Sequence, residues 1–221
     1  MQTTASNPKL QTGITGSSGV LPLPDKSCKF KNATKTSMSI GGYKIRDQRA
    51  IHFITFAVVE WVDVFTRKAY RDILIDSLRH CQQEKGLVLH AWCIMSNHVH
   101  LLASVKENNL SDILRDFKKF TSKQLLAAIQ ANEHESRKAW MLHIFQKAGE
   151  ANGRNTTCQF WRQDNQPKEC FTPAFTAQKI DYIHNNPVEA GLVEKPEDYP
   201  YSSAKTYRTN EESSLLPVVC L

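Results

Sequence analysis

The chain has 221 residues, of which 41% are hydrophobic and 23% charged, which is typical of a globular protein with one sizeable core. No run approaches the roughly 18 consecutive apolar residues of a membrane span, and we see no secretion signal, so we expect no membrane partner. Six cysteines without a Cys-x-x-Cys pair predict reduced thiols and a cytoplasmic location. The net charge of +6 mildly favours a polyanionic partner.

Composition divides the chain into three parts. Residues 1–42 are rich in Ser, Thr, Gly, Pro and Lys without periodicity, which predicts a disordered leader or an upstream segment. We expect one domain over residues 43–207 and a flexible tail over 208–221.

The first half of this domain predicts a strand, a helix, a hairpin and a second helix. Residues 51–59 are β-branched and aromatic, which indicates a strand, and residues 67–84 form an amphipathic helix ended by Gly86. Residues 87–95 and 98–105 predict two strands joined by the short turn Ser96-Asn97. A long helix follows, capped by Ser111 or Asn109 and ending near Ala131.

The second half is less regular. Within residues 132–157 we expect only a short helix around 137–146, and residues 159–163 suggest a short strand. Thr172-Pro173 begins a helix that should stop near Asn186, because Pro187 disfavours helix before it. Residues 194–207 predict an irregular tail packed on the core. The element order predicts an α+β fold with a ferredoxin-like antiparallel sheet and helices on one face.

Two histidines stand one residue apart in the third strand. Successive side chains of a strand point to opposite faces, so His98 and His100 share a face. Such a pair suits a metal site or acid–base chemistry, but it also occurs as two exposed histidines of a half-solvated sheet.

A second pair lies on the last long helix. Tyr182 and Asn186 are four residues apart and therefore share a helical face. A divalent ion held by two imidazoles and a side-chain carbonyl would polarise a phosphodiester, and a phenol could then attack phosphorus. Taken alone, Tyr182 also fits a core tyrosine, and Asn186 also fits a residue near a helix C-terminus.

Several segments together resemble a known family. They are Trp92-x-Ile94-Met95-Ser96-Asn97-His98-Val99-His100-Leu101-Leu102, Phe160-Trp161, Asp181-Tyr182-Ile183-His184-Asn185-Asn186-Pro187-Val188-Glu189-Ala190-Gly191-Leu192-Val193 and Pro196-Glu197-Asp198-Tyr199-x-Tyr201-Ser202-Ser203. Over residues 43–207 the chain resembles the IS200-like HUH single-tyrosine (Y1) transposases, in particular the REP-associated tyrosine transposases. The histidine motif alone is weak evidence for this resemblance, whereas its combination with the Asn-Pro-Val block is strong evidence.

The resemblance implies an enzyme that nicks and rejoins single-stranded DNA at hairpins or palindromes, for transposition or repeat processing. It implies the HUH Y1 transposase fold, a 5′-phosphotyrosine intermediate on Tyr182, and Mg²⁺ or Mn²⁺ held by His98, His100 and Asn186. The IS200/IS605 branch typically has Gln at the place of Asn186. Relatives of the IS200 type are dimers with the tyrosine helix supplied in trans, whereas the REP-associated group looks monomeric, so monomer and homodimer both stay open.

Some related transposases carry the tyrosine in the first long helix. Here that segment reads Lys118-Lys119-Phe120-Thr121, and a phenylalanine cannot be a nucleophile, so that helix is structural or binds DNA. We expect phosphate contacts from basic residues, and stacking or core packing from Trp92 and Trp161. The basic residues are Arg115, Lys118, Lys119, Lys123 and Arg162.

Two other functions remain open. A non-cleaving protein of the same fold would bind hairpin or single-stranded DNA and use the histidines only structurally. A metal-dependent nucleotide hydrolase would use His98 and His100 but would leave the Asn-Pro-Val block without a role.

Overall fold

The computed structural model describes residues 45–152, 157–163, 166–209 and 215–221, all within one unit that spans residues 40–221. The predicted leader at 1–42 lies outside the described residues. No helix in these ranges has both the length and the apolar character needed to cross a membrane.

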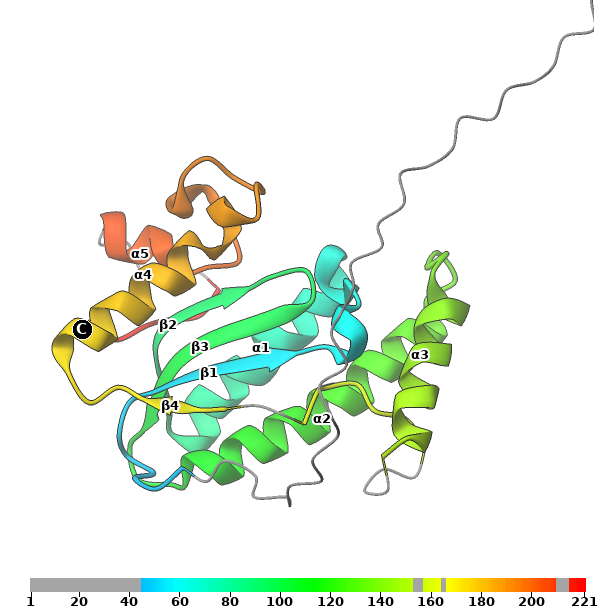
Figure 1. Cartoon of the computed structure of the whole chain (residues 1–221), viewed down its shortest axis with the longest axis horizontal. Coiled ribbons are helices and arrows are strands. Elements are labelled where there is room, and N and C mark those ends of the chain that lie inside the picture. Colours follow the sequence, from blue (N-terminus) through cyan, green and yellow to red (C-terminus); the bar gives the residue numbers. More distant parts are fainter. Residues whose placement is uncertain (1–44, 153–156, 164–165, 210–214) are drawn as a thin grey trace, which may run out of the picture. The chain divides into compact units, whose positions relative to one another are not determined.

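The centre of the fold is a four-stranded antiparallel sheet (Figure 1). Its strands are β1 (His52–Ala57), β2 (Leu87–Ile94), β3 (His98–Val105) and β4 (Lys168–Glu169), in the order β2-β3-β1-β4. Helix α1 (Lys68–Lys85) follows β1, and α2 (Leu110–Ala131) follows β3. This β-α-β-β-α-β order confirms the predicted α+β, ferredoxin-like fold.

The termini of these elements follow the local sequence. Gly86 ends α1 in the left-handed conformation, with φ of 71°. The N-cap of α2 is Asn109 rather than Ser111, and its side chain makes no capping hydrogen bond. Residues Ser96 and Asn97 form the tight connection between β2 and β3.

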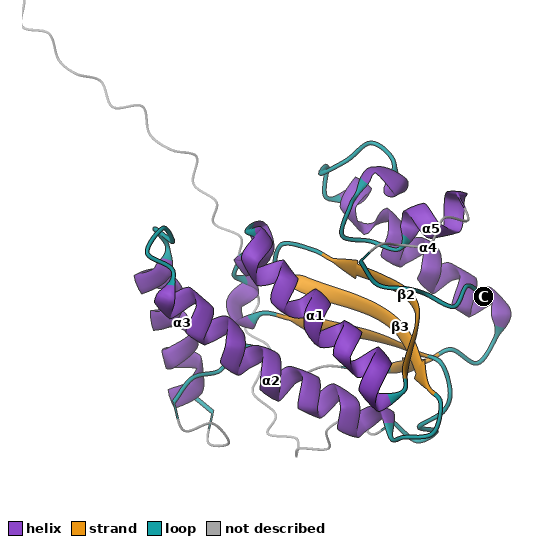
Figure 2. Cartoon of the chain, turned by 180° about the vertical axis from the view of Figure 1, so that it is seen from behind, coloured by secondary structure: helices purple, strands orange, loops and turns teal. Residues whose placement is uncertain are grey.

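One face of the sheet packs against α1 and α2, which lie in front of the strands in Figure 2. Alternate residues of β1 and β3 point to this face and pack against the apolar stripes of both helices. Examples are Ile54, Val99 and Leu101. This cluster is the larger of the two hydrophobic cores.

The prediction that helices lie on one face only is wrong, because α4 (Pro173–Glu189) covers the opposite face. Strands β1, β2 and β3 are apolar on that face too, through Phe53, Ala91 and Leu102. A second apolar face must be buried, and Ile180 and Ile183 of α4 pack on it.

Two predicted elements differ from the structure. Helix α3 (Lys138–Glu150) is longer than expected, and residues 159–163 form only an isolated bridge, Val58 with Trp161. The fourth strand comes later, at Lys168–Glu169, where the polar sequence carries no strand pattern. Short helices complete the described chain: Val59–Trp61, Val64–Thr66, Pro196–Asp198 and α5 (Ala204–Thr209).

The C-terminal residues lie against β2. The segment after α4 pairs with this strand, because Ser203 donates its backbone N–H to Trp92 and Ile94 donates to Tyr201. The sequence predicts a flexible tail over 208–221, yet Leu216 is fully buried and the backbone N–H of Val219 donates to Leu89. The described residues of this tail therefore cover part of the strand edge.

Candidate functional site

The two histidines lie side by side on the face of β3 that meets α4. Their ring centroids are 4.6 Å apart. His100 is 3% exposed and stacks on Phe53 at 5.5 Å, whereas His98 is partly buried at the end of the strand. The predicted common face is therefore confirmed, and it is buried under a helix rather than solvated.

Each imidazole is oriented through its Nδ1 atom. His98 Nδ1 lies 2.7 Å from Asn97 Oδ1, and His100 Nδ1 lies 2.8 Å from the hydroxyl of Thr55. The Asn97 oxygen can only accept a hydrogen bond, so His98 carries its proton on Nδ1. His100 Nε2 lies 3.3 Å from Asn186 Nδ2, and with the amide in this orientation Nε2 accepts its hydrogen bond.

Burial keeps both rings neutral. Burial lowers the pKa of His98, although Asn186 and the charge of Asp63 partly oppose this shift. The pKa of His100 is lowered to about 3, mainly by burial and in addition by electrostatic interaction with His98 and Lys179. Neutral imidazoles with free Nε2 lone pairs are the form in which histidine binds metal ions.

Helix α4 brings Tyr182 and Asn186 to the same place. The Tyr182 ring lies 5.2 Å from His100 and 5.7 Å from Phe53, measured between centroids. Tyr182 is 41% exposed, so its hydroxyl is accessible to a large substrate. Because α4 packs on the sheet of its own chain, a single chain contains all four residues of the predicted site.

Two contacts fix the position of α4. Thr172 caps its start, since the Thr172 hydroxyl accepts from the backbone N–H of Phe175 at 3.2 Å. In its middle, His184 Nε2 lies 2.9 Å from the hydroxyl of Ser203. Burial lowers the pKa of His184 to about 4, so this histidine is a neutral structural residue at pH 7.

The end of α4 corrects the prediction that the helix stops near Asn186. Pro187 lies inside the helix, which continues to Glu189. Leu192 donates its backbone N–H to Pro187 and Gly191 donates to Val188, with Gly191 at φ of 69°. This is a Schellman motif, and it explains the Asn-Pro-Val-x-Ala-Gly-Leu block as the C-terminal stop of the helix that carries the tyrosine.

Lys179 is a functional candidate that the sequence analysis missed. Its ammonium group lies 5.6 Å from the centroid of Tyr182 and 5.2 Å from that of Phe53. The spacing Lys179-x-x-Tyr182 could have revealed it, because residues three apart share a helical face.

The donor set fits a divalent cation. The described residues contain no group of three His, Cys, Asp or Glu side chains that could hold a metal ion. The candidate centre instead combines two imidazoles with an amide. If the Asn186 amide turns by half a rotation, its Oδ1 replaces Nδ2 beside His100 Nε2. Hydrogen bonds to both Nδ1 atoms are the usual supports of metal-binding histidines.

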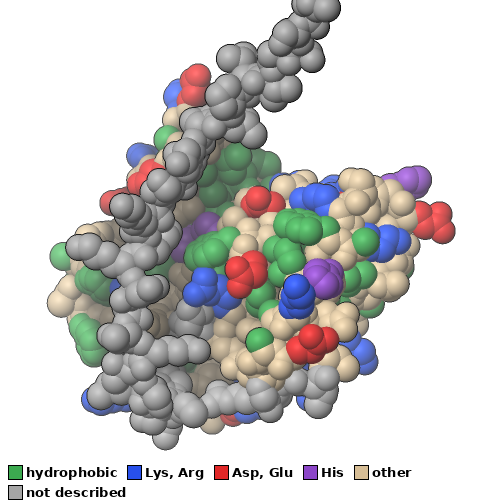
Figure 3. All heavy atoms as spheres, turned by 45° about the vertical axis from the view of Figure 1, so that its right-hand side comes forward, with side chains coloured by type: hydrophobic (Ala, Val, Ile, Leu, Met, Phe, Trp, Pro, Cys, Tyr) green, Lys and Arg blue, Asp and Glu red, His purple; other side chains and the backbone are tan. Residues whose placement is uncertain are grey.

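The predicted DNA-binding residues of α2 do not join this site. Arg115, Lys118, Lys119 and Lys123 lie on a helix that packs against the other face of the sheet. Arg115 pairs with Asp112 and Asp116. On the face seen in Figure 3, basic and acidic side chains are interspersed and no single basic patch forms. A DNA-binding role for α2 stays a prediction.

The tryptophans separate into core and surface residues. Trp92 is fully buried and Trp161 is 4% exposed, so both serve core packing. Trp161 donates its indole N–H to Thr121. Trp61, which the sequence analysis did not single out, is 49% exposed and its ring centroid lies 5.7 Å from that of His98.

Comparison with known proteins agrees with the resemblance. Residues 47–150 match the family model described as "Transposase IS200 like". This range includes both histidines of the site but ends before α4. No curated protein sequence is significantly similar to the chain.

Two solved structures are similar. One is a REP-associated tyrosine transposase bound to a REP hairpin, with a TM-score of 0.52, 16% identity, and coverage of 81% of this chain and 89% of that one. This likeness shows the fold. The other, assigned as a transposase and from Deinococcus radiodurans R1, has a TM-score of 0.39 and 21% identity over 67% of this chain and 97% of that one.

Proposed function

We propose that this chain, which is related to the IS200-like transposases through residues 47–150, nicks and rejoins single-stranded DNA beside a hairpin. The family match supports DNA transposition or processing in general. The proposal of nicking and rejoining rests on one observation. In a single chain, Tyr182 and Asn186 lie beside two neutral histidines.

In this proposal Tyr182 is the nucleophile. Its hydroxyl oxygen attacks the phosphorus of a DNA phosphodiester, and the bond to the 3′ oxygen breaks. The products are a 5′-phosphotyrosine and a free 3′-hydroxyl. The phenol loses its proton to water at this exposed position, and the departing 3′ oxygen takes up a proton from water. Attack by a 3′-hydroxyl on the phosphotyrosine reverses the step, so the energy of the phosphodiester is conserved and no external energy source is required.

The remaining residues prepare this attack. His98, His100 and Asn186 would hold Mg²⁺ or Mn²⁺, which neutralises charge on a nonbridging phosphate oxygen when bound. Phe53 packs against both His100 and Tyr182, which fixes the distance between nucleophile and ligands. The ammonium group of Lys179 places positive charge beside the Tyr182 ring, where it attracts an incoming phosphate.

The hairpin substrate is inferred from the structural relative. That protein is bound to a REP hairpin, and it shares the fold of this chain. The net charge of +6 supports a polyanionic substrate and predicts that binding weakens as salt rises.

The test is the covalent adduct. The protein is incubated with single-stranded hairpins from the DNA that flanks its own gene, in Mn²⁺, and adducts are resolved under denaturing conditions. We expect an adduct from the wild type, none from Tyr182→Phe, and loss of metal-dependent cleavage in His98→Ala and His100→Ala. If Tyr182→Phe still forms an adduct, the assignment of Tyr182 as the nucleophile is wrong.

The same experiment separates the two alternatives. Cleavage without an adduct would favour a metal-dependent hydrolase. Salt-sensitive hairpin binding without cleavage would favour the non-cleaving DNA-binding protein. Tyr207→Phe is a matched control, because this tyrosine lies on α5 and its hydroxyl donates to the backbone of His90, away from the histidine pair.

A further inference from the structure

Trp61 lies on a strained turn between β1 and α1. Glu60 and Trp61 both adopt the left-handed conformation, with φ of 51° and 54°. Residues other than glycine rarely do so, and two in succession cost conformational free energy that other contacts must offset. The turn leaves the indole 49% exposed.

Hydrogen bonds from the β2–β3 turn hold this conformation. Asn97 Nδ2 donates to the carbonyl of Trp61 at 3.2 Å and to Asp63 Oδ1 at 3.0 Å. The hydroxyl of Ser96 donates to the same Asp63 oxygen at 2.6 Å. Since Asn97 Oδ1 also orients His98, one amide ties the position of Trp61 to that of a proposed metal ligand.

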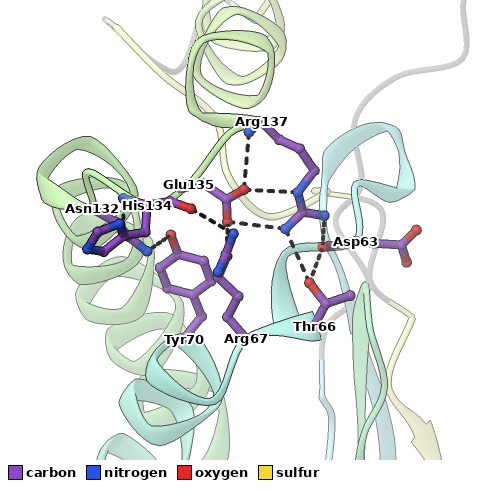
Figure 4. Close-up of polar contacts among 8 residues, drawn as sticks. All are labelled: Asp63, Thr66, Arg67, Tyr70, Asn132, His134, Glu135 and Arg137. Carbon is purple, nitrogen blue, oxygen red and sulfur yellow. Dashed lines mark hydrogen bonds and ion pairs between the residues drawn. The ribbon is translucent and has the colours of Figure 1, made fainter.

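An ion network holds the turn from its other side (Figure 4). Glu135 is buried between the guanidinium groups of Arg67 and Arg137, with contacts of 2.6 Å and 3.0 Å. Arg137 donates onward to the carbonyl of Asp63 and the hydroxyl of Thr66. The segment around Trp61 is therefore fixed at several points and is preorganised to present the indole.

The indole lies between a proposed metal ligand and a cation. Its edge-on partner is His98, at 5.7 Å between centroids, and the guanidinium carbon of Arg162 lies 5.4 Å from the indole centroid. This contact links Arg162, one of the predicted DNA-binding residues, to the ring that lies against His98. An exposed aromatic ring and a guanidinium group are the usual partners of an unpaired base and its phosphate.

We propose that Trp61 and Arg162 form a binding site for an unpaired nucleotide that flanks the hairpin, with the base stacked on the indole and the phosphate paired with the guanidinium group. This inference rests on the proposed function, because it assigns the site to the DNA strand that reaches Tyr182. The position beside His98 places the bound nucleotide next to the reacting phosphate.

The test compares a blunt hairpin with the same hairpin carrying a single-stranded tail of about 10 nucleotides. Affinities are measured by fluorescence anisotropy in EDTA, so that no cleavage occurs. We expect the wild type to prefer the tailed hairpin. Trp61→Gly should lower the affinity for the tailed hairpin about 10-fold and leave the affinity for the blunt hairpin unchanged. Glycine is chosen because it accepts the positive φ, which keeps the turn intact.

Trp140→Ala is the matched control, because Trp140 of α3 is exposed to a similar extent, 53%. Arg162→Lys should weaken tail binding less than Arg162→Gln. Tryptophan fluorescence gives a second readout: in Trp140→Phe, oligothymidylate should quench the emission of Trp61, since Trp92 and Trp161 are buried. The circular dichroism of each variant verifies its fold.

Equal tail affinity in Trp61→Gly and the wild type would overturn the inference, as would a wild type that binds both hairpins equally or shows no quenching. Loss of affinity for both hairpins together would assign Trp61 to a general structural or protein-contact role and would also overturn it. If Trp61→Gly loses only tail binding but the wild type forms no adduct in Mn²⁺, the proposed function fails while the nucleotide site stands.

Discussion

His100 and Thr55 are directly opposite in the β1–β3 register, and the Thr55 hydroxyl lies 2.8 Å from His100 Nδ1. This contact crosses the sheet from a neighbouring strand, so the orientation of the more buried histidine depends on strand pairing. It leaves Nε2 facing Asn186.

Thr55→Val tests this orientation. Valine is as favourable in a strand as threonine and fills the same volume, so we expect the fold to persist. Without the hydroxyl, the ring loses its positioning partner, and Mn²⁺ affinity should fall about 10- to 100-fold in calorimetric titration. Thr55→Ser should retain most of the affinity, because it keeps the hydroxyl. Unchanged affinity in Thr55→Val would show that His100 is not held for a metal ion.

Asn186 is predicted to supply the third ligand. Asn186→Ala should weaken Mn²⁺ binding at least about 10-fold and reduce adduct formation in parallel. Asn186→Asp should bind the ion more tightly, because a carboxylate is a better ligand for hard cations than an amide. Calorimetry measures the affinities and a denaturing gel the adduct. If alanine and aspartate variants bind Mn²⁺ like the wild type, Asn186 is not a ligand.

Gly191 is predicted to contribute through its backbone alone. No atom lies within 4 Å of the position that a Cβ would occupy, so Gly191→Ala adds no clash and only imposes the cost of a positive φ. We expect a loss of about 1 kcal/mol in the free energy of unfolding, measured with urea. Gly191→Asn should lose less, since asparagine tolerates this conformation. A neutral alanine variant would mean that the turn after α4 readily changes its conformation.

The sequence predicts three of the four strands well, because β1, β2, β3 and the first two helices obey clear periodicities. The turn at Ser96-Asn97 and the end of a helix at Gly86 are encoded by the local sequence, and both are present in the structure. The pairs His98–His100 and Tyr182–Asn186 could each be predicted from spacing, and the family resemblance suggested that they meet. Their actual approach depends on α4 covering the second face of the sheet, which pattern alone did not predict.

The missed features have physical reasons. Pro187 is compatible with helix because it lies in the last turn, where it costs one hydrogen bond and is buried. Strand β4 has two residues and is defined by pairing with β1 rather than by its own composition. Trp61 lies in a run without turn residues, so its left-handed backbone could not be predicted. Its conformation depends on Asn97, 36 residues away.

Because of Glu135, the stability of the fold should change with pH in the acid range. Hydrogen bonds from Arg137 and Arg67 lower the pKa of this buried carboxyl to about 2, from an ordinary value of 4.5. Because the folded pKa is depressed, the carboxylate contributes its full stability above pH 4.5 and loses it as the pH falls toward about 2. Glu135→Gln should therefore unfold more easily at pH 7, by about 1.5–3 kcal/mol.

The difference between Glu135→Gln and the wild type should shrink as the pH is lowered from 4.5 to 2, as measured by urea unfolding at several pH values. Glu133→Gln is a suitable control, because Glu133 is an exposed carboxyl two residues away. A difference that stays constant across this range would mean that the carboxylate is not stabilised by its charge. Because Arg137 also holds Asp63 and Thr66, we expect Glu135→Gln to loosen the turn that presents Trp61 as well.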